Sequence, residues 1–321
     1  MDYRRLGSTG LRISRLGLGC GNFGGIGSAP ELFGRGENEA EAFAIMDRAV
    51  AAGINVFDTA ASYGGGRSES WIGSWRRQRD ASVLLSTKVY WSVTGDPADR
   101  GLSRERIVGE LAGSLSRLQA KRVDMYLTHE PDYETPIEET LRALDELVGA
   151  GKVGAIGISN VDGEQLDEAL AASDRHGLAR FAWVQNEYSL LRRQSERDVL
   201  PLCAREGLGF TPFSPLCGGW LTGKYSRAQA FPDDSRMALR GEPYSDLVNE
   251  RTFQGLERFQ AAAAERGVEP AELAIAWVLN HPQVTSVIVG PRRPEQLDAA
   301  LRATEIRLSE QERDELAELF A

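Results

Sequence analysis

The sequence contains few cysteines and few histidines, which limits the chemistry it can support. Its three cysteines, at positions 20, 203 and 217, form neither an even disulfide set nor a closely spaced metal cluster. The three histidines, His129, His176 and His281, have no close pairwise spacing, so no histidine-rich metal site is expected. The simplest expectation is a reduced protein of the cytoplasm that holds no metal ion.

Long apolar runs and an excess of positive charge are also missing. No uninterrupted apolar stretch approaches the roughly 20 residues that cross a membrane. Residues 1–5 lead directly into patterned sequence without a secretory apolar region. The formal net charge is −10, which argues against a nucleic-acid partner. An anionic ligand would therefore need basic residues that are concentrated locally.

Short apolar runs recur through the whole chain, with stretches of helical periodicity between them. Several runs are nearly continuous in Val, Ile and Leu, which is typical of parallel strands covered by helices. The expected strands are residues 16–19, 54–58, 83–89, 123–129, 153–159, 181–185, 208–212 and 286–290.

Two of the expected helices begin with capping sequences. Thr135 is expected to be an N-cap, with Pro136 at the first helical position and Glu138 completing a capping box. Ser309 begins the last helix in the same way. Both patterns place the start of a helix directly after a loop.

About eight strand–helix units follow one another with no linker between them. This alternation predicts one (β/α)8 TIM barrel over residues 1–321 better than a doubly wound sheet. Residues 3–14 predict a β-hairpin, with its turn at residues 7–10, that closes one end of the barrel. Residues 20–37 and 214–249 are rich in Gly, Pro and polar residues and are expected to be long loops at the active-site face.

Four chemically reactive residues lie at or near the ends of expected strands. Asp58, Lys88 and His129 each end an apolar run, and Tyr63 follows the first of them in a glycine-flanked loop. The strand ends that precede the βα loops form the active site of a TIM barrel. An isolated Asp or His there is often a helix cap or a structural residue. A lysine that ends a buried strand needs an anion, however, and Asp58 is the obvious candidate.

In order and spacing these four residues resemble the Asp/Tyr/Lys/His tetrad of the aldo-keto reductase superfamily. The chain is most similar to the branch of potassium-channel β-subunits and general bacterial reductases, over nearly its whole length. The resemblance implies a nicotinamide-dependent oxidoreductase acting on an aldehyde or ketone, sugars included. Lys88 would lower the pKa of the Tyr63 phenol so that it serves as proton donor. His129 would donate a hydrogen bond to the carbonyl oxygen.

No strand is followed by a Gly-x-Gly-x-x-Gly fingerprint and a helix, so the sequence lacks the usual pattern of a dinucleotide-binding sheet. The cofactor-binding residues are instead implied by the resemblance. Ser159, Asn160 and Gln185 resemble the residues that bond the nicotinamide carboxamide. Phe213 resembles the aromatic residue that stacks on the nicotinamide ring, although core packing is the more common role of an aromatic. The other expected cofactor contacts are Gly19, Ser214, Pro215, Leu216, Gly218, Lys224, Arg236, Gly290, Arg292 and Gln296.

The pair Arg292 and Arg293 favours NADPH over NADH, because a guanidinium matches the geometry of a phosphate.

Two features of the sequence depart from the family pattern. Ala299 and Ala300 stand where the family often carries Glu and Asn, which removes contacts to the adenosine. Glu130, directly after His129, is less usual and could alter the charge of that imidazole.

Phe23, Trp91, Tyr133 and Trp220 are expected to form an aromatic wall for the substrate. Such a wall suits aldehydes, ketones and sugar rings equally, so the expected partner is a small carbonyl compound of unspecified class. The alternative function is a nicotinamide-binding regulatory subunit with slow turnover. A metal-dependent barrel hydrolase is a third, disfavoured reading. The oligomeric state is left open.

Overall fold

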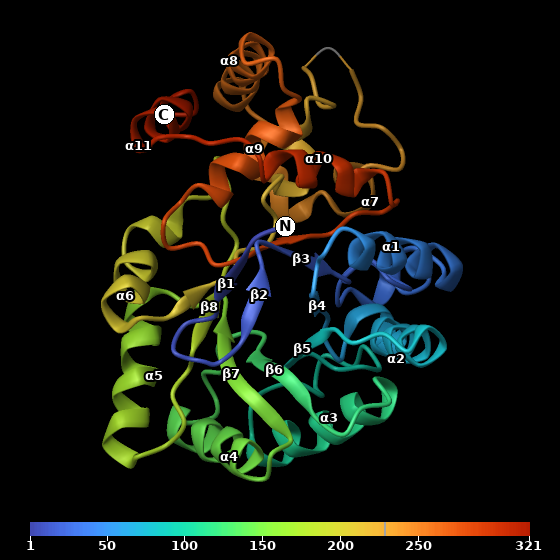
Figure 1. The fold of residues 1–321 in the computed structure, drawn as a ribbon, viewed down its shortest axis with the longest axis vertical. Helices are drawn as coiled ribbons and strands as arrows, with labels where there is room; N and C mark the ends of the chain where they lie inside the picture. The colour runs from blue at the N-terminus through green and yellow to red at the C-terminus, as the bar shows by residue number, and fades with distance from the viewer. Residues whose placement is uncertain (228) are drawn as a thin grey trace.

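Figure 1 shows the computed structural model, which describes residues 1–227 and 229–321, as a ring of strands surrounded by helices. Eight parallel strands form one curled sheet in the order β10-β3-β4-β5-β6-β7-β8-β9. Two backbone hydrogen bonds join the ends of this sheet: Thr285 N donates to Phe210 O and Ile288 N to Pro212 O, both at 2.8 Å. The expected TIM-barrel fold is confirmed.

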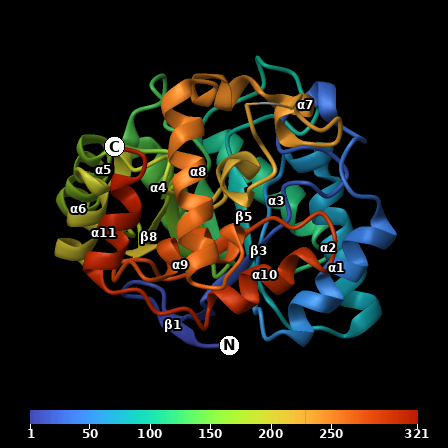
Figure 2. The same ribbon diagram turned by 90° about the horizontal axis from the view of Figure 1, so that it is seen from above.

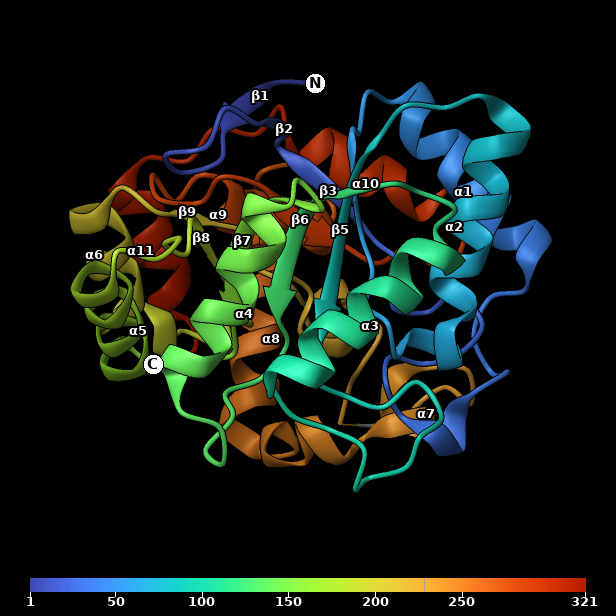
Figure 3. The ribbon, with the colours of Figure 1, turned by 90° about the horizontal axis from the view of Figure 1, so that it is seen from below.

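Every strand of the barrel lies inside one of the expected apolar runs. Two of them, β3 (Leu16–Gly19) and β7 (Val153–Ser159), match the expected bounds, and the others are shorter at one or both ends. Figure 3 shows β5 and β6 side by side and pointing the same way. The remaining strands are β4 (Val56–Asp58), β5 (Leu84–Val89), β6 (Val123–Thr128), β8 (Trp183–Gln185), β9 (Gly209–Phe210) and β10 (Val287–Val289).

Six helices connect the first seven barrel strands, one between each pair, and pack on the outside of the ring (Figure 1). Their inward faces bury apolar side chains against the sheet, which forms the larger part of the core. These helices are α1 (Glu39–Ala51), α2 (Arg67–Arg79), α3 (Arg104–Arg117), α4 (Ile137–Gly149), α5 (Gly163–His176) and α6 (Val199–Glu206).

The last part of the chain is more elaborate than a strand–helix repeat. In its described residues, the connection from β9 to β10 contains five helical segments, and Figure 2 shows its α8 and α9 beside α10. These five segments are η4 (Cys217–Thr222), α7 (Arg236–Arg240), η5 (Glu242–Leu247), α8 (Glu250–Glu265) and α9 (Pro270–Leu279). After β10 follow α10 (Gln296–Ala303) and α11 (Glu310–Glu318).

One of the two expected capping boxes is present. Ser309 accepts a hydrogen bond from Glu312 N at 3.2 Å, and the Glu312 carboxylate accepts one from Ser309 N at 2.9 Å. The box expected at Thr135 is wrong. Pro136 has a ψ of 137°, outside the helical region, so the helix begins at Ile137 and Thr135 lies one residue too early to cap it.

The hairpin of β1 (Tyr3–Arg5) and β2 (Arg12–Ser14) closes the N-terminal end of the barrel, as expected. Figure 3 shows it at the end opposite α7, and the strand arrows point away from it. Its apolar residues enter the barrel, where they join a cluster separate from the outer core. The cluster consists of Leu6, Ile13, Val56, Met125, Leu127, Ala155, Ala182 and Trp183.

Side chains two residues apart along a strand lie on the same face of the sheet, so the interior face continues to the C-terminal end of the barrel. Val56 belongs to the interior cluster, so Asp58, two residues further along β4, points to the same side. Leu127 of β6 has the same relation to His129. The reactive strand ends therefore converge at the C-terminal mouth of the barrel.

Candidate active site

Four reactive side chains, here called the tetrad (Asp58, Tyr63, Lys88 and His129), lie within contact of one another at this mouth. Lys88 Nζ is 2.6 Å from Asp58 Oδ2 and 3.3 Å from Tyr63 Oη. Tyr63 Oη is in turn 3.4 Å from His129 Nε2. The phenol therefore lies between an ammonium and an imidazole, as the sequence predicted.

The ion pair at the base of the tetrad is buried and has several hydrogen-bond partners. Lys88 is 2% exposed and Asp58 4%. Lys88 Nζ also donates to Thr59 O at 2.8 Å, while Ser86 Oγ and Gln185 Nε2 donate to Asp58 Oδ1 at 3.0 and 3.1 Å. Burial disfavours the ammonium, but the charge of Asp58 and the contacts of Nζ with Asp58 and Tyr63 raise the pKa of Lys88 above its ordinary value. The lysine is held charged beside the phenol.

Tyr63 begins η2 (Tyr63–Gly66), directly after β4. Backbone packs on one side of its ring: a side chain at Gly21 would lie 3.6 Å from the ring carbons. Burial raises the pKa of the Tyr63 phenol, and the Lys88 ammonium acts in the opposite direction but does not outweigh burial. The expectation that Lys88 brings this pKa below its ordinary value is therefore wrong for this structure, and the phenol is protonated at neutral pH.

His129 is neutral in this setting. Burial, and then the charge of Lys88, hold the pKa of His129 well below its ordinary value. Its Nδ1 atom is buried and has no hydrogen-bond partner among the described residues. The unusual neighbour Glu130 accepts from Asn160 Nδ2 at 3.1 Å, and burial raises the pKa of that carboxyl.

The residues expected to bind the carboxamide form a hydrogen-bonded chain that leads to the tetrad. Ser159 Oγ donates to Gln185 O at 2.5 Å, and Asn160 Nδ2 donates to His129 O at 3.0 Å. The amide nitrogens of Asn160 and Gln185 are thus engaged within the protein, so a carboxamide N–H could bond only to their side-chain oxygens. Phe213 is partly exposed, which leaves its ring available for stacking.

Three of the expected phosphate-binding residues gather into what is here called the cation cluster (Lys224, Arg236 and Arg292). Burial lowers the pKa of Lys224, the charge of Asp234 opposes this, and the charges of Arg292 and Arg236 lower the pKa further. Arg236 donates to Asn22 Oδ1 at 3.0 Å, and Arg292 Nε donates to Glu37 Oε1 at 2.9 Å. Neither loop residue was expected from the sequence, since Glu37 lies 255 positions from its partner.

The remaining expected cofactor residues surround these two groups. Gly19 is paired with Asp58 in the sheet register, and a side chain there would come within 2.9 Å of Ile288. Gly218, at a φ of 62°, packs against the ring of Tyr244, a residue that the sequence did not single out. Other positions are the turn Ser214, Pro215 and Leu216 before η4, Gly290 after β10, and Gln296, which accepts from Arg292 N at 2.7 Å.

The expected aromatic wall is largely wrong. Phe23 and Trp220 are both 0% exposed, so neither can contact a substrate in this structure. Trp220 packs on the aromatic rings of residues 225, 231 and 253, because the long β9–β10 connection forms an apolar core of its own. Tyr133 is 85% exposed, and only its hydroxyl is engaged, by Gln165. Trp91 alone lies partly exposed beside Glu130, next to the tetrad.

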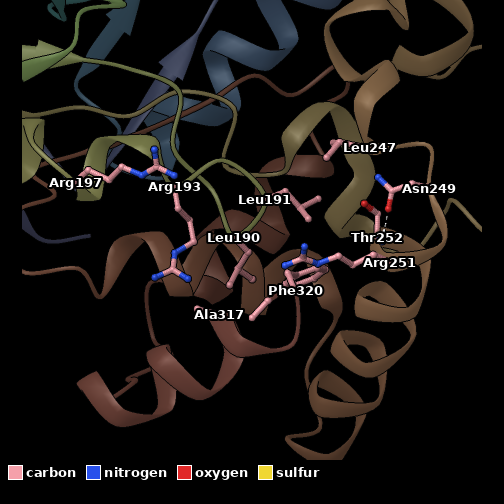
Figure 4. Close-up of a pocket in the computed structure, with 11 residues that line it drawn as sticks. Leu190, Leu191, Arg193, Arg197, Leu247, Asn249, Arg251, Thr252, Ala317 and Phe320 are labelled. Atoms are coloured by element: carbon pink, nitrogen blue, oxygen red, sulfur yellow. Dashed lines mark hydrogen bonds between the residues drawn. The ribbon is translucent and has the colours of Figure 1, made fainter.

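Figure 4 shows a shallow cavity elsewhere on the protein, with a volume of about 400 Å³. Leucine and phenylalanine side chains form its apolar part, and Arg193, Arg197 and Arg251 also line it. No tetrad residue lines it. We do not assign it to the reaction.

Three further features of the described residues bear on the possible chemistry. Cys20, Cys203 and Cys217 are free and buried. No group of three or more His, Cys, Asp or Glu side chains in residues 1–227 and 229–321 is placed to hold a metal ion. None of the helices in this part of the chain combines the length and apolar character needed to span a bilayer.

Comparison with known proteins agrees with the family that the sequence resembles. The aldo/keto reductase family model matches residues 15–321. The uncharacterized oxidoreductase YrpG of Bacillus subtilis (strain 168) is 41% identical over 323 residues, 97% of this chain and 93% of the relative. A probable voltage-gated potassium channel subunit beta of Oryza sativa subsp. japonica is 38% identical, covering 95% and 92%. Versiconal hemiacetal acetate reductase of Aspergillus parasiticus is 31% identical, covering 100% and 97%. This chain therefore belongs to the aldo/keto reductase family.

Proposed function

We propose that this protein is an NADPH-dependent oxidoreductase that reduces the carbonyl group of an aldehyde or ketone, sugars included, to an alcohol. The observation that carries the proposal is the phenol of Tyr63, 3.3 Å from the buried ammonium of Lys88. The relatives named as an oxidoreductase and as a reductase support the same class of reaction.

When bound, the nicotinamide supplies a hydride to the carbonyl carbon. Tyr63 supplies the proton: burial raises the pKa of this phenol, so it carries its proton at neutral pH and donates it to the carbonyl oxygen. The phenolate that remains is stabilised by Lys88, which Asp58 holds charged and in position. In the reverse direction, the same phenolate accepts the proton of the alcohol.

His129 orients the carbonyl group. Its depressed pKa keeps the imidazole neutral, so it donates a hydrogen bond without competing with Tyr63 as an acid. Because Nε2 lies 3.4 Å from Tyr63 Oη, both groups can reach one substrate oxygen. The imidazole and the phenol would thus fix where the developing negative charge lies.

The residues present fit a nicotinamide dinucleotide at both ends. Phe213 offers a partly exposed ring near the tetrad. The cation cluster concentrates positive charge on a chain of net charge −10, as a polyphosphate ligand requires. Arg292 and the exposed Arg293 favour the additional phosphate of NADPH. The three free cysteines suit a reducing compartment such as the cytoplasm.

Replacing Tyr63 by Phe tests the proposal. We expect the variant to bind NADPH as the wild type does but to reduce carbonyl compounds roughly 10²- to 10⁴-fold more slowly, because the proton donor is lost. Binding is measured by quenching of protein fluorescence, and turnover by nicotinamide absorbance with a panel of aldehydes, ketones and sugars. Tyr133→Phe, at an exposed position, is the matched control. A Tyr63→Phe variant with most of its activity would refute the assignment.

The similarity to plant proteins named as probable potassium channel β-subunits favours a second candidate function. In this case the chain would bind a nicotinamide cofactor, turn over slowly and report redox state to a partner protein. Steady-state turnover separates the two candidates. Rapid oxidation of NADPH with simple aldehydes supports the enzyme, whereas one fast turnover followed by very slow product release supports the regulatory subunit.

A further inference from the structure

A buried carboxylate lies against the cation cluster. Glu37 is only 4% exposed, and its Oε1 accepts a hydrogen bond from Arg292 Nε at 2.9 Å. Its second oxygen, Oε2, is buried and has no hydrogen-bond partner among the described residues. A charged oxygen without a donor is costly, so this carboxylate is not there to stabilise the fold alone.

The backbone of the first loop holds Glu37 in this place independently of Arg292. Glu37 N donates to Asn22 O, and Gly24 N donates to Glu37 O, each at 2.9 Å. The preceding residue, Gly36, fits because any side chain there would come within 2.7 Å of Gly25 N. The loop is therefore built to present a carboxylate at this point.

Positive charge reaches the same point from two other segments. Arg292 follows β10, while Arg236 begins α7 and donates to Asn22 in the loop that carries Glu37. The charges of Arg292 and Glu37 both act on Arg236. Two other acidic residues act here: the charge of Asp234 acts on Lys224, and that of Glu41 on Glu37. Asp234 is exposed, however, and its bond to Arg292 comes from its backbone carbonyl, at 2.8 Å. Glu37 is thus the buried carboxylate that bonds directly to the guanidinium of Arg292.

We propose that Glu37 occupies the place of a cofactor phosphate on Arg292 and must yield that guanidinium when the dinucleotide binds. A carboxylate and a phosphate use the same donors of an arginine, and two adjacent anions repel each other. Glu37 therefore weakens cofactor binding. The inference rests on the proposed function, because it takes the ligand to be a nicotinamide dinucleotide.

The test is calorimetric titration of the intact protein with NADP⁺ and NAD⁺, without a carbonyl substrate. Glu37→Gln keeps the size of the side chain and removes its charge, so we expect about tenfold tighter binding of NADP⁺. A gain for NADP⁺ alone identifies the 2′-phosphate as the competing group, and an equal gain for NAD⁺ identifies the pyrophosphate. Glu39→Gln, on the exposed first turn of α1, removes the same charge and should change affinity less than about twofold. Unchanged or weaker binding by Glu37→Gln overturns the inference.

A double-mutant cycle excludes a purely structural effect. In an Arg292→Gln background, Glu37→Gln should no longer tighten binding, because the guanidinium for which it competes is gone. An equal gain in both backgrounds contradicts the proposed competition. A wild-type protein that binds neither dinucleotide refutes the proposed function itself. If the wild type binds and Glu37→Gln binds with the same affinity, only the role of Glu37 is refuted.

Discussion

The tetrad and the cation cluster lie at the same face of the barrel but are built in different ways. Asp58 ends β4 and Lys88 is the last residue but one of the neighbouring β5, and residues of the sheet supply partners such as Ser86 and Gln185. The cation cluster instead draws its residues from connections after β9 and β10 and its partners from the loop after β3. One group belongs to the sheet, and the other is assembled from loops.

The difference extends to how completely the charged side chains at each place are paired. The buried ammonium of Lys88 has three oxygen partners, two of them within 2.8 Å. Beside the cation cluster, one carboxylate oxygen of Glu37 has no hydrogen-bond partner in residues 1–227 and 229–321, and the pKa of Lys224 is lowered. We infer that the tetrad is organised before ligands arrive, whereas the cluster exchanges an internal anion for an external one.

The largest expected effect breaks the tetrad without touching the cluster. Lys88→Met should lower kcat by about 10³-fold, because the phenolate loses its stabilising charge, while affinity for NADP⁺ stays within about threefold. Rapid-mixing turnover and calorimetric titration measure the two quantities. The exposed Lys152→Met variant serves as control. If Lys88→Met lost binding and turnover equally, the two groups would not be separable.

The same contrast explains which parts of the site the sequence could predict. Asp58, Lys88 and His129 end apolar runs, and the two-residue alternation of a strand fixes the side to which they point. The contact between Glu37 and Arg292 joins positions 255 residues apart, and no local pattern encodes it. All eight barrel strands were predictable for the same reason as the tetrad.

The aromatic wall failed because exposure depends on tertiary packing. Trp220 is an aromatic residue in an active-site loop, as expected of a substrate contact, but the rings of Tyr225, Phe231 and Phe253 pack around it. A glycine- and proline-rich segment gives no sign that it will fold into helical turns around an apolar centre of its own. Loop composition therefore predicted where the segment lies but not which of its side chains face the substrate.

A second, smaller effect should break the cluster without touching the tetrad. Arg292→Gln removes a phosphate donor, so we expect about tenfold weaker binding of NADP⁺ and little change in kcat at saturating cofactor. Arg293→Gln, at the exposed neighbouring position, should weaken binding less. Calorimetry gives the affinities and steady-state kinetics give kcat. A fall in kcat equal to the loss of affinity would contradict the separation of the two regions.

The smallest effect concerns pH, to which cofactor binding at the cation cluster should respond and turnover at the tetrad should not. Burial, and then the charge of Lys88, hold the pKa of His129 well below its ordinary value, so titration of this imidazole should not alter turnover around neutral pH. Burial raises the pKa of Glu37, although Arg292 opposes this and Glu41 adds to it. A phosphate bound alongside would raise that pKa further, so binding takes up a proton and the affinity of the wild type gains as pH falls.

The cofactor phosphate also takes up a proton, with a pKa near 6, but this affects wild type and Glu37→Gln alike. The ratio of their dissociation constants for NADP⁺ therefore isolates the carboxylate. We expect the wild-type dissociation constant, divided by that of Glu37→Gln, to fall about threefold toward one as the pH is lowered from about 8 to about 5.5. The reason is that protonated Glu37 no longer competes with the phosphate for Arg292. Arg236, which also senses the charge of Glu37, is unchanged in both proteins and cancels from the ratio. A ratio that stays constant over this range would mean that Glu37 remains charged when the cofactor binds, and the exchange of one anion for another would then require the carboxylate to move away rather than to be neutralised.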